Sequence, residues 1–403
     1  MQSAHQPLEG LRVIDFSGMI AGGFATMQLA DFGADVVTIE HPKYPDPLRS
    51  WPPFDEEESL WWKSIGRNKR CITLDLSTED GKKIALKLVE DADLVFENFR
   101  PGTMERWGLG PEQLQEVNAS VILVRVSGFG QTGPLSDHPG FGTIAEGFSG
   151  WAHVNGFPDR EPLLPPISLA DLTAGLFAVH GAMFALYEQH LRPDHTDGDG
   201  QVVDISLYEP LFRLFAADVE TYDRLERVPE RTGNHHPSAA PRGIYETTDG
   251  WITLSASSQA IYENVVQAID RTDLIEDERF RTNDRRVENA DLLDEIIEAW
   301  TRERSTDEVL ETMRAHDAIV GPVYDIADIY EDEQFNERDN IVEMDDETFG
   351  TLQTPSPVPK LSKTPGEAVH AGMPQGHHNK DVFLNELNLS TEEYDRLRDE
   401  GVI

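Results

Sequence analysis

The sequence predicts an α/β protein in which a parallel sheet forms the larger part. Residues 11–16 form an apolar run typical of a buried strand, residues 21–32 have helical periodicity, and residues 35–40 form a second apolar run. A strand, a helix and a second strand in this order make a βαβ unit, and such units imply a parallel sheet. After about residue 225, acidic amphipathic helices and a hairpin signal follow, which predict a smaller α+β domain.

The βαβ pattern continues to about residue 207. The segment 77–80 approximates a capping box with Asp80 in place of Glu, and it predicts a helix that runs to residue 91. Residues 172–191 form the most apolar helix, in which Gly175, Gly181 and several alanines favour close packing. Further strands are predicted at residues 71–76, 93–97, 121–127 and 201–207, and a further helix at residues 208–224.

The later residues predict a hairpin, helices and an extended segment. The turn T-T-D-G at residues 247–250 lies between two β-rich runs and indicates a hairpin. Residues 355–364 are rich in proline and are expected to be extended. Helices are predicted at residues 288–302, 306–315 and 390–399.

Acidic residues dominate the composition along the whole chain. The 403 residues include 74 Asp and Glu against 34 Lys and Arg, for a formal charge of −40, and only nine of the basic residues are lysines. A dispersed, lysine-poor acidic surface keeps a protein hydrated in concentrated salt, where the Debye length falls to about 3 Å. The composition therefore predicts a halophilic source, with an ordinary acidic cytosolic protein as the alternative. Nucleic acids and anionic membranes are not expected as partners, because their phosphates would be repelled.

The chain offers no intrachain disulfide and no signal peptide. Its single cysteine, Cys71, lies in an apolar run and is expected to be a small buried hydrophobic residue. Residues 1–7 lack the charged and apolar regions of a signal peptide. No apolar run approaches about 18 residues, so we predict that no segment spans a membrane and that the protein is cytoplasmic.

A glycine-rich segment, G-M-I-A-G-G at residues 18–23, lies between the first predicted strand and helix. It can cradle a phosphate at the helix N-terminus, or it can serve close packing alone. It departs from the pattern G-x-G-x-x-G, which argues against a nicotinamide-dependent oxidoreductase.

Asp171 stands at the start of the most apolar helix. The simplest interpretation is a helix N-cap. The same position suits a nucleophile, because the amides and the positive dipole end of a helix favour an ionised carboxylate. Such a carboxylate in an otherwise apolar cleft can attack a thioester.

Basic and histidine residues provide weaker candidates. Arg100 and Arg106 follow a predicted strand end, where open α/β sheets bind ligands, and guanidinium groups suit phosphates, although each can equally form a surface ion pair. His195 with its acidic neighbours, and the histidine pairs 235–236 and 377–378, lack the spacing of metal ligands. We predict solvated loops there and no metal site.

Three sequence blocks together carry a family resemblance. They are E-N-F-R-P-G at residues 97–102, S-G-F-G-Q-T-G-P at residues 127–134 and S-L-A-D-L-T-A-G at residues 168–175. In this order and at these spacings the chain resembles the family III coenzyme A transferases, the group of formyl-CoA and carnitine CoA-transferases. The resemblance runs nearly from end to end, through residues 8–16, 30–37, 68–76, 200–207, 321–324 and 400–403.

The resemblance implies an architecture. Residues 1–224 would form most of a Rossmann-like large CoA-binding domain, and residues 225–330 a small α+β domain. Residues 331–403 would be a linker and a C-terminal segment that completes the large domain. Two such chains would interlock as a homodimer.

The resemblance also implies a mechanism and a set of contacts. Asp171 would attack an acyl-CoA donor, and CoA would pass through an aspartyl anhydride and an aspartyl-CoA thioester to a small carboxylic acid. CoA would be a substrate, with no tightly bound cofactor. The matching positions for CoA contacts are His41, Leu74, Asn98, Phe99, Arg100 and Arg106.

Two departures from the family pattern bear on the substrate. Ile20 stands where formyl-CoA transferase has a substrate-contacting Gln, which favours a bulkier, partly apolar acyl group. Phe141 and Gly142 stand where the related α-methylacyl-CoA racemase has a His-Asp pair, and a racemase needs two bases. We expect transfer from succinyl-CoA to a small dicarboxylate such as mesaconate, an activity that suits a haloarchaeal source. The racemase, the oxidoreductase and a non-catalytic CoA-binding protein remain alternatives.

Overall fold

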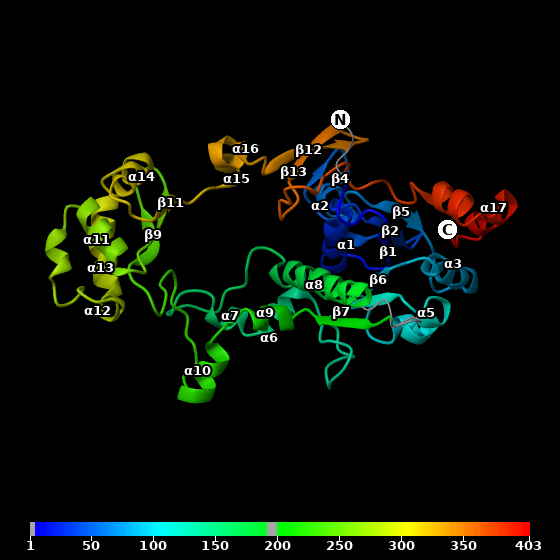
Figure 1. Ribbon diagram of the computed structural model, residues 1–403, viewed down its shortest axis with the longest axis horizontal. Coiled ribbons are helices and arrows are strands. Elements are labelled where there is room, and N and C mark those ends of the chain that lie inside the picture. The colour runs from blue at the N-terminus through cyan, green and yellow to red at the C-terminus, as the bar shows by residue number, and fades with distance from the viewer. Residues whose placement is uncertain (1–4, 192–199) are drawn as a thin grey trace. The chain divides into compact units, whose positions relative to one another are not determined.

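The computed structural model describes residues 5–191 and 200–403, and it divides the chain into two compact units (Figure 1). The large unit comprises the chain up to Trp151 together with Leu164–Glu220 and Glu337–Ile403. The small unit comprises Ala152–Leu163 and Thr221–Asn336. Each unit has its own hydrophobic core.

A six-stranded sheet forms the centre of the large unit, in the order β5-β2-β1-β6-β7-β8. All five neighbouring pairs are parallel, as the βαβ pattern predicts. The chain therefore runs outward from β1 in one direction and then returns to build the other half from β6, so the strand order reverses between β1 and β6. The strands are β1 (Arg12–Asp15), β2 (Asp35–Glu40), β5 (Arg70–Thr73), β6 (Leu94–Glu97), β7 (Ile122–Ser127) and β8 (Val202–Ser206).

Helices cover both faces of this sheet, which makes a three-layer α/β/α arrangement. Alternate residues of each strand face opposite sides, so Val13 packs with α1 (Ala21–Asp31) and α8 (Leu169–Leu191), while Ile14 packs in the opposite layer. The predicted α/β class with a parallel sheet is confirmed. The opposite layer contains α3 (Glu79–Val89), α5 (Pro111–Val117), a π-helical turn (Asp381–Glu386) and α17 (Thr391–Asp399).

Three helix boundaries differ from the sequence predictions. Thr78, rather than Ser77, caps α3, and its hydroxyl accepts the Gly81 N–H at 3.0 Å. Helix α8 begins at Leu169, so Asp171 is its third residue and not its N-cap. The single helix predicted at residues 208–224 is wrong: α9 (Glu209–Arg213) and α10 (Asp218–Leu225) are separated by Ala216, whose φ of 45° cannot continue a right-handed helix.

Helix α8 also corrects the prediction that no apolar run approaches 18 residues. Its 23 residues are long and apolar enough, by length and composition only, to cross a membrane. Ala170, Ala174, Ala178 and Ala182 are fully buried, and their spacing of four residues forms one face that packs in the core with β6 and β7. This packing accounts for the alanine stripe, because a helix that lies flat on a sheet must bury one continuous face.

The C-terminal segment packs into the large unit at several buried positions. The Asp75 N–H donates to the Val402 carbonyl at 2.7 Å. Arg67 forms a buried ion pair with Asp31 and donates to Thr354 in the hairpin of β12 (Ile341–Asp346) and β13 (Gly350–Pro355). The remaining elements of the large unit are the 3-10 turn Pro47–Ser50, β3 (Phe54–Asp55), β4 (Glu58–Ser59), α2 (Leu60–Ile65), α4 (Thr103–Arg106) and α6 (Gly142–Phe148).

The small unit contains an antiparallel sheet in the order β11-β10-β9 and several helices. The predicted hairpin is confirmed, since β9 (Arg242–Glu246) pairs with β10 (Trp251–Ser255) across the turn. A capping box formed by Ser305 and Glu308 opens α14 (Thr306–Ala315). The other elements are α11 (Gln259–Ala268), the 3-10 turn Thr272–Ile275, α12 (Asn283–Glu288), α13 (Ala290–Thr301), β11 (Val320–Pro322), α15 (Ile326–Glu331), α16 (Glu333–Glu337) and α7 (Trp151–Val154), which straddles the two units.

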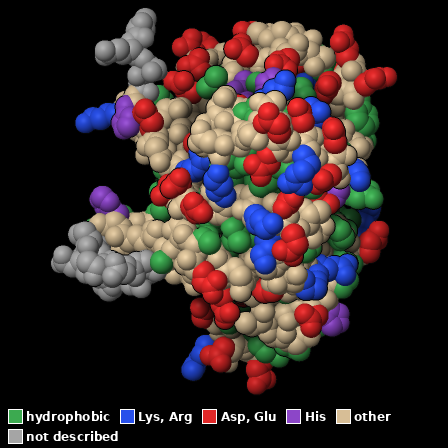
Figure 2. Space-filling model, turned by 90° about the vertical axis from the view of Figure 1, so that its right-hand side faces the viewer, with side chains coloured by type: hydrophobic (Ala, Val, Ile, Leu, Met, Phe, Trp, Pro, Cys, Tyr) green, Lys and Arg blue, Asp and Glu red, His purple; other side chains and the backbone are tan. Residues whose placement is uncertain are grey.

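Acidic side chains are spread over the surface with basic side chains between them, as Figure 2 shows for one face. Several arginines are held between acids from distant parts of the chain. Arg12 and Arg70 both contact Asp35 and Glu386, which ties the sheet edge to the C-terminal segment. The arginine-rich, lysine-poor composition thus supplies planar cations that can pair with two carboxylates at once.

Candidate active site

A cavity of about 870 Å³ lies in the large unit at the carboxyl ends of β1, β6 and β7. In open α/β sheets ligands bind at this edge, where the strand order reverses. None of the described residues that line the cavity is Lys, Arg or His. We call it the Asp171 cavity, and its lining consists of residues 18–21, Trp51, Trp61, Asn98, Phe99, residues 126–128, residues 140–143, Glu146, residues 164–168, Asp171 and Leu207.

Asp171 projects from the first turn of α8 onto α6. Its carboxylate lies so close to Gly142 that a Cβ on Gly142 would come within 2.2 Å of Asp171 Oδ2. Burial, followed by the nearby charge of Glu146, raises the pKa of Asp171 to about 6. The carboxylate is therefore ionised at neutral pH and more basic than an exposed aspartate, which suits a nucleophile.

Glu146 is a second acid in the same cavity, and the sequence analysis did not single it out. It belongs to α6 and is only 3% exposed. Its Oε1 accepts the Ala170 N–H at the start of α8, at 3.4 Å, and burial raises its pKa. No local motif indicates this role, because the contact joins residues 24 positions apart.

Asn98 lines the cavity, and its side-chain amide bonds to the backbone of Gly18. Its Nδ2 donates to the Gly18 carbonyl at 2.6 Å, and its Oδ1 accepts the Gly18 N–H at 3.0 Å. This pair of hydrogen bonds joins the loop after β1 to the loop after β6, at the point where the strand order reverses. Asn98 therefore holds the cavity wall, and the neighbouring Phe99 also belongs to the lining.

The loop after β1 has a second support in Asp46. Met19 has a φ of 60°, and its N–H donates to Asp46 Oδ2 at 2.9 Å. Burial raises the pKa of Asp46, and the hydrogen bonds from Leu48 and Met19 oppose that rise. Because a left-handed methionine is uncommon, this hydrogen bond helps to keep the Met19 backbone in place.

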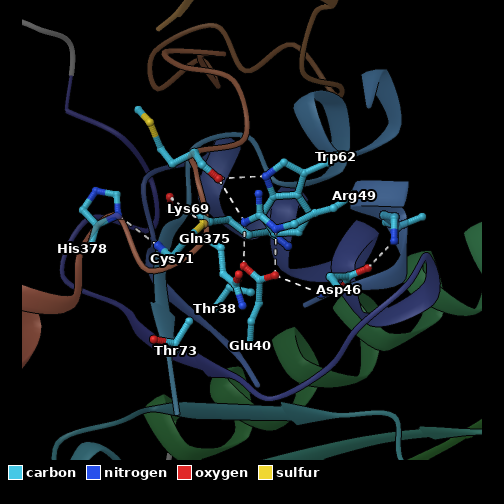
Figure 3. Close-up of polar contacts among 12 residues, drawn as sticks. Thr38, Glu40, Asp46, Arg49, Trp62, Lys69, Cys71, Thr73, Gln375 and His378 are labelled. Atoms are coloured by element: carbon cyan, nitrogen blue, oxygen red, sulfur yellow. Dashed lines mark hydrogen bonds and ion pairs between the residues drawn. The ribbon is translucent and has the colours of Figure 1, made fainter. Parts of the chain in front are cut away.

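A buried polar network stands behind Asp46 (Figure 3). Glu40 Oε2 accepts the Asp46 N–H at 2.9 Å, and the Glu40 carboxylate also pairs with Arg49. The Arg49 guanidinium lies over the Trp62 ring, and both side chains donate to the Met373 carbonyl. The wall of the cavity is thereby connected to the C-terminal segment.

A smaller cavity of about 260 Å³ adjoins the first, and the two share Gly18 and Phe99. We call it the His41 cavity. His41, Leu74, Phe99 and Trp107 line it, and His41 Nε2 lies 3.4 Å from Asp75 Oδ2. Three of the six predicted CoA-contact residues, His41, Leu74 and Phe99, are therefore brought together here.

Arg100 and Arg106 lie apart from the lining of both cavities. Both side chains are exposed, and Arg106 donates to Thr103 in its own short helix α4 at 2.9 Å. The described structure therefore fits two roles for these arginines equally well, as ordinary surface residues or as contacts for a phosphate.

Two tryptophans in the cavity wall were also missed by the sequence analysis. Trp51 and Trp61 meet edge to face, with ring centroids 6.0 Å apart. They flank the short hairpin formed by β3 and β4. The only sequence signal was the concentration of aromatic residues between residues 51 and 62.

Residues 5–191 and 200–403 contain no group of three His, Cys, Asp or Glu side chains placed to hold a metal ion. His235 bonds to Asp294 at 2.6 Å, and His378 accepts the Cys71 N–H at 3.0 Å. Burial lowers the pKa of His378 to about 4, and the Cys71 thiol is buried as predicted. His195 lies outside the described residues.

Comparison with known proteins identifies the family of this chain. The family model described as CoA-transferase family III matches residues 8–379. The succinyl-CoA–D-citramalate CoA-transferase of Chloroflexus aurantiacus is 38% identical over 404 residues, covering 100% of this chain and 99% of the relative. The alpha subunit of a succinyl-CoA–L-malate CoA-transferase from Chloroflexus aurantiacus is 36% identical, covering 98% of this chain and 92% of the relative.

Solved structures agree on the fold. A CAIB/BAIF family protein from Brucella suis superposes with a TM-score of 0.83 at 28% identity. The match covers 94% of this chain and 99% of the Brucella protein.

Proposed function

Because the chain belongs to CoA-transferase family III, we propose that it moves CoA from succinyl-CoA to a small dicarboxylic acid, with Asp171 as the nucleophile. The observation that carries this proposal is the Asp171 carboxylate, which is ionised at neutral pH and lies in a cavity large enough for an acyl-pantetheine end. The relatives named for succinyl-CoA as donor support the same choice of donor.

The exchange proceeds in two halves. An Asp171 oxygen attacks the thioester carbonyl, the carbon–sulfur bond breaks, and CoA leaves as a thiolate. The thiolate then attacks the Asp171 carbonyl of the resulting anhydride, succinate leaves with the bridging oxygen, and an aspartyl-CoA thioester remains. The acceptor carboxylate repeats these steps in reverse order, which replaces one difficult exchange by several easier ones.

The protein's own residues assist these steps by position. The start of α8 presents its positive dipole end to the carboxylate, and Gly142, which has no side chain, lets the carboxylate lie close against α6. Asn98 and Asp46 hold the loop that carries Met19 and Ile20 in the facing wall. A fixed wall orients the thioester toward Asp171, and such orientation supplies much of the rate enhancement in a bimolecular exchange.

We propose a methyl-branched acid of four-carbon backbone, such as mesaconate or a related dicarboxylate, as the acceptor. Ile20 is almost fully buried in the lining, where it can contact an apolar branch, and formyl-CoA transferase has a polar Gln at this position. The named acceptors of two relatives, citramalate and malate, have backbones of this length. The test is a panel of acceptors assayed with succinyl-CoA, in which mesaconate is expected to exceed glutarate in kcat/KM.

Trapping of the intermediate tests the nucleophile. The protein is incubated with succinyl-CoA in about 2–3 M KCl, a range suggested by the acidic surface, and hydroxylamine is added before peptide mapping by mass. We expect a hydroxamate on Asp171, and exchange in Asp171→Asn reduced by about 10⁴-fold or more. An unmodified Asp171 with every acyl-CoA donor tried, together with active Asp171→Asn, would exclude the proposal. Deuterium uptake into a 2-methylacyl-CoA without exchange would instead identify a racemase.

We also propose that the protein works as a salt-adapted cytoplasmic homodimer. The formal charge of −40 supports salt adaptation. Apolar side chains on the outward face of α8 support self-association, because exposed apolar patches of this kind mark interaction surfaces. Light scattering in high KCl is expected to give the mass of a dimer. The exposed α8 side chains are Leu176, Phe184, Tyr187 and Leu191.

A further inference from the structure

Helix α6 presents two residues to the start of α8. Gly142 and Glu146 are four positions apart, so they lie on the same face of α6. Gly142 packs against the Asp171 carboxylate, and Glu146 reaches the Ala170 N–H. One helical face thus holds both the nucleophile candidate and the turn from which it projects.

Glu146 occupies a position where a negative charge is favoured. The first N–H groups of a helix have no acceptor within the helix. In α8 the Leu169 N–H bonds to the Ile167 carbonyl at 2.8 Å, and the Ala170 N–H bonds to Glu146. Glu146 therefore acts as a cap supplied by a different helix, and the α8 dipole offsets part of the cost of burying its carboxylate.

The other elements packed against α8 carry charges that are held by their own partners. Arg125 of β7 pairs with Glu97 and Glu105. Asp204 of β8 accepts the Gln131 N–H, and Glu209 of α9 accepts the Ser206 hydroxyl.

The remaining charged groups near α8 do not alter this assignment. Helix α1 meets the start of α8 with uncharged residues, of which Ala21 and Ala25 contact Gly175. The second charged residue of α9, after Glu209, is Arg213. The acid at the far end of α1, Asp31, pairs with Arg67. Among the described groups, Glu146 is the charge that acts on Asp171.

We propose that Glu146 is a positioning residue that fixes the first turn of α8 and uses its negative charge to favour acylation of Asp171. This inference rests on the proposed role of Asp171. In the first half of the exchange the Asp171 carboxylate becomes a neutral thioester, one of its oxygens leaves with succinate, and the negative charge leaves with that oxygen. Two neighbouring carboxylates become one, and the relief of their repulsion favours the acylated enzyme.

Two substitutions separate the effect of the Glu146 charge from the effect of its side-chain length. Glu146→Gln keeps the length and an oxygen that can accept the Ala170 N–H, but it removes the charge. Glu146→Asp keeps the charge but shortens the side chain by one methylene. Glu112→Gln, at an exposed position on α5, is the matched control for loss of a negative charge.

The first measurement is the pH dependence of kcat/KM. In the wild-type protein the acidic limb is expected near pH 6, where Asp171 titrates. Removal of the Glu146 charge lowers the pKa of Asp171, so the limb of Glu146→Gln moves to lower pH by about one unit. The limbs of Glu146→Asp and Glu112→Gln stay in place.

The second measurement is the ratio of aspartyl-CoA enzyme to free enzyme at fixed succinyl-CoA and succinate, determined by intact mass. This ratio is expected to fall about tenfold in Glu146→Gln, since one pKa unit is a factor of ten. Melting temperature and CoA binding confirm that each variant is folded. If Glu146→Gln does not fold, Glu146→Ala, which also removes the negative charge, takes its place in both measurements.

An unmoved limb and an unchanged ratio in folded Glu146→Gln would overturn the proposal, as would equal changes in Glu146→Asp. Wild-type trapping distinguishes the two levels of failure. A hydroxamate on Asp171 with no effect of Glu146→Gln rejects only the role of Glu146. No hydroxamate on Asp171 rejects the role of Asp171 itself.

Discussion

The two cavities of the large unit meet at Gly18 and Phe99 but are built differently. The Asp171 cavity is walled by backbone loops, apolar side chains and two acids, with no Lys, Arg or His among its described lining. The His41 cavity is smaller, and its lining combines an imidazole, three acidic residues and aromatic rings. The first is suited to forming and breaking a bond at a carbonyl, and the second to holding a flat group by shape.

The difference indicates where charge is used in this protein. In the Asp171 cavity the pKa of an acid is raised by burial and by a like charge, which makes the carboxylate a stronger nucleophile. Arg100 of the E-N-F-R-P-G block and Arg106, which follows the block, are exposed and lie outside the lining of the His41 cavity. We therefore expect substitutions in the Asp171 cavity to reduce catalysis, and substitutions at the arginines to change CoA affinity only weakly.

The largest of the following effects is expected from Gly142→Ala. The new methyl group would lie 2.2 Å from Asp171 Oδ2, so the carboxylate must move away from its position. A displacement of about 1 Å costs roughly 100-fold in rate, and we expect that loss in kcat/KM. Steady-state exchange from succinyl-CoA measures it.

Gly147→Ala is the matched control, because Gly147 lies on the same helix and its Cβ would meet nothing within 4 Å. This variant is expected to keep full activity. Equal activity of the two variants would show that the contact between Gly142 and Asp171 does not matter for the reaction.

A smaller effect is expected from Asn98→Ala. The substitution removes both hydrogen bonds to Gly18 and lowers the free energy of unfolding by about 1–3 kcal/mol. The loosened wall is expected to reduce kcat/KM by roughly tenfold. Urea unfolding and steady-state kinetics measure the two effects.

Asn118→Ala is the matched control for Asn98→Ala. The Asn118 amide likewise makes two hydrogen bonds to the backbone, by donating to the carbonyls of Val89 and Ala92, but Asn118 lines neither cavity. We expect a similar loss of stability with unchanged kcat/KM. A tenfold loss of kcat/KM in both variants would mean that stability, and not the position of Gly18, determines the rate.

The smallest effect is expected from Arg106→Ala. If the exposed guanidinium meets a CoA phosphate, KM for succinyl-CoA rises about threefold at the lowest salt that keeps the protein folded, since an exposed ion pair is worth under about 1 kcal/mol. Concentrated KCl removes the difference by screening. Arg398→Ala, an exposed arginine on α17, is expected to leave KM unchanged. A change of roughly two orders of magnitude would instead place Arg106 inside a closed binding site.

The sequence was a good guide to local elements and a poor one to contacts. Strands such as β2 coincide with the predicted residues 35–40, because the apolar run and its boundaries are local properties. The break at Ala216 was missed because an alanine with positive φ has no local signature. Likewise, the start of α8 was predicted too late, at Leu172 instead of Leu169, because it depends on Glu146, 24 residues before Ala170.

At the candidate site, too, the sequence indicated individual residues better than the contacts between them. A family resemblance directed attention to Asp171, His41 and Phe99, and the structure brings these residues to two adjoining cavities. The sequence did not indicate that the Asn98 amide bonds to the Gly18 backbone, and the predicted contact of Asn98 with CoA stays a prediction. Neither Glu146 nor Trp51 lies in a sequence pattern that indicates a cavity, because each lines the cavity only in the folded structure.

By itself, the sequence determined the α/β class, the acidic surface and the chemistry available at Asp171. These follow from periodicity, composition and residue type, which act over a few neighbouring residues. Only the tertiary structure decided that Gly142 faces Asp171, that Glu146 lies beside it and that Asn98 closes on Gly18. Such contacts join segments from different strands and helices, so they exist only once the sheet has brought those segments to one edge.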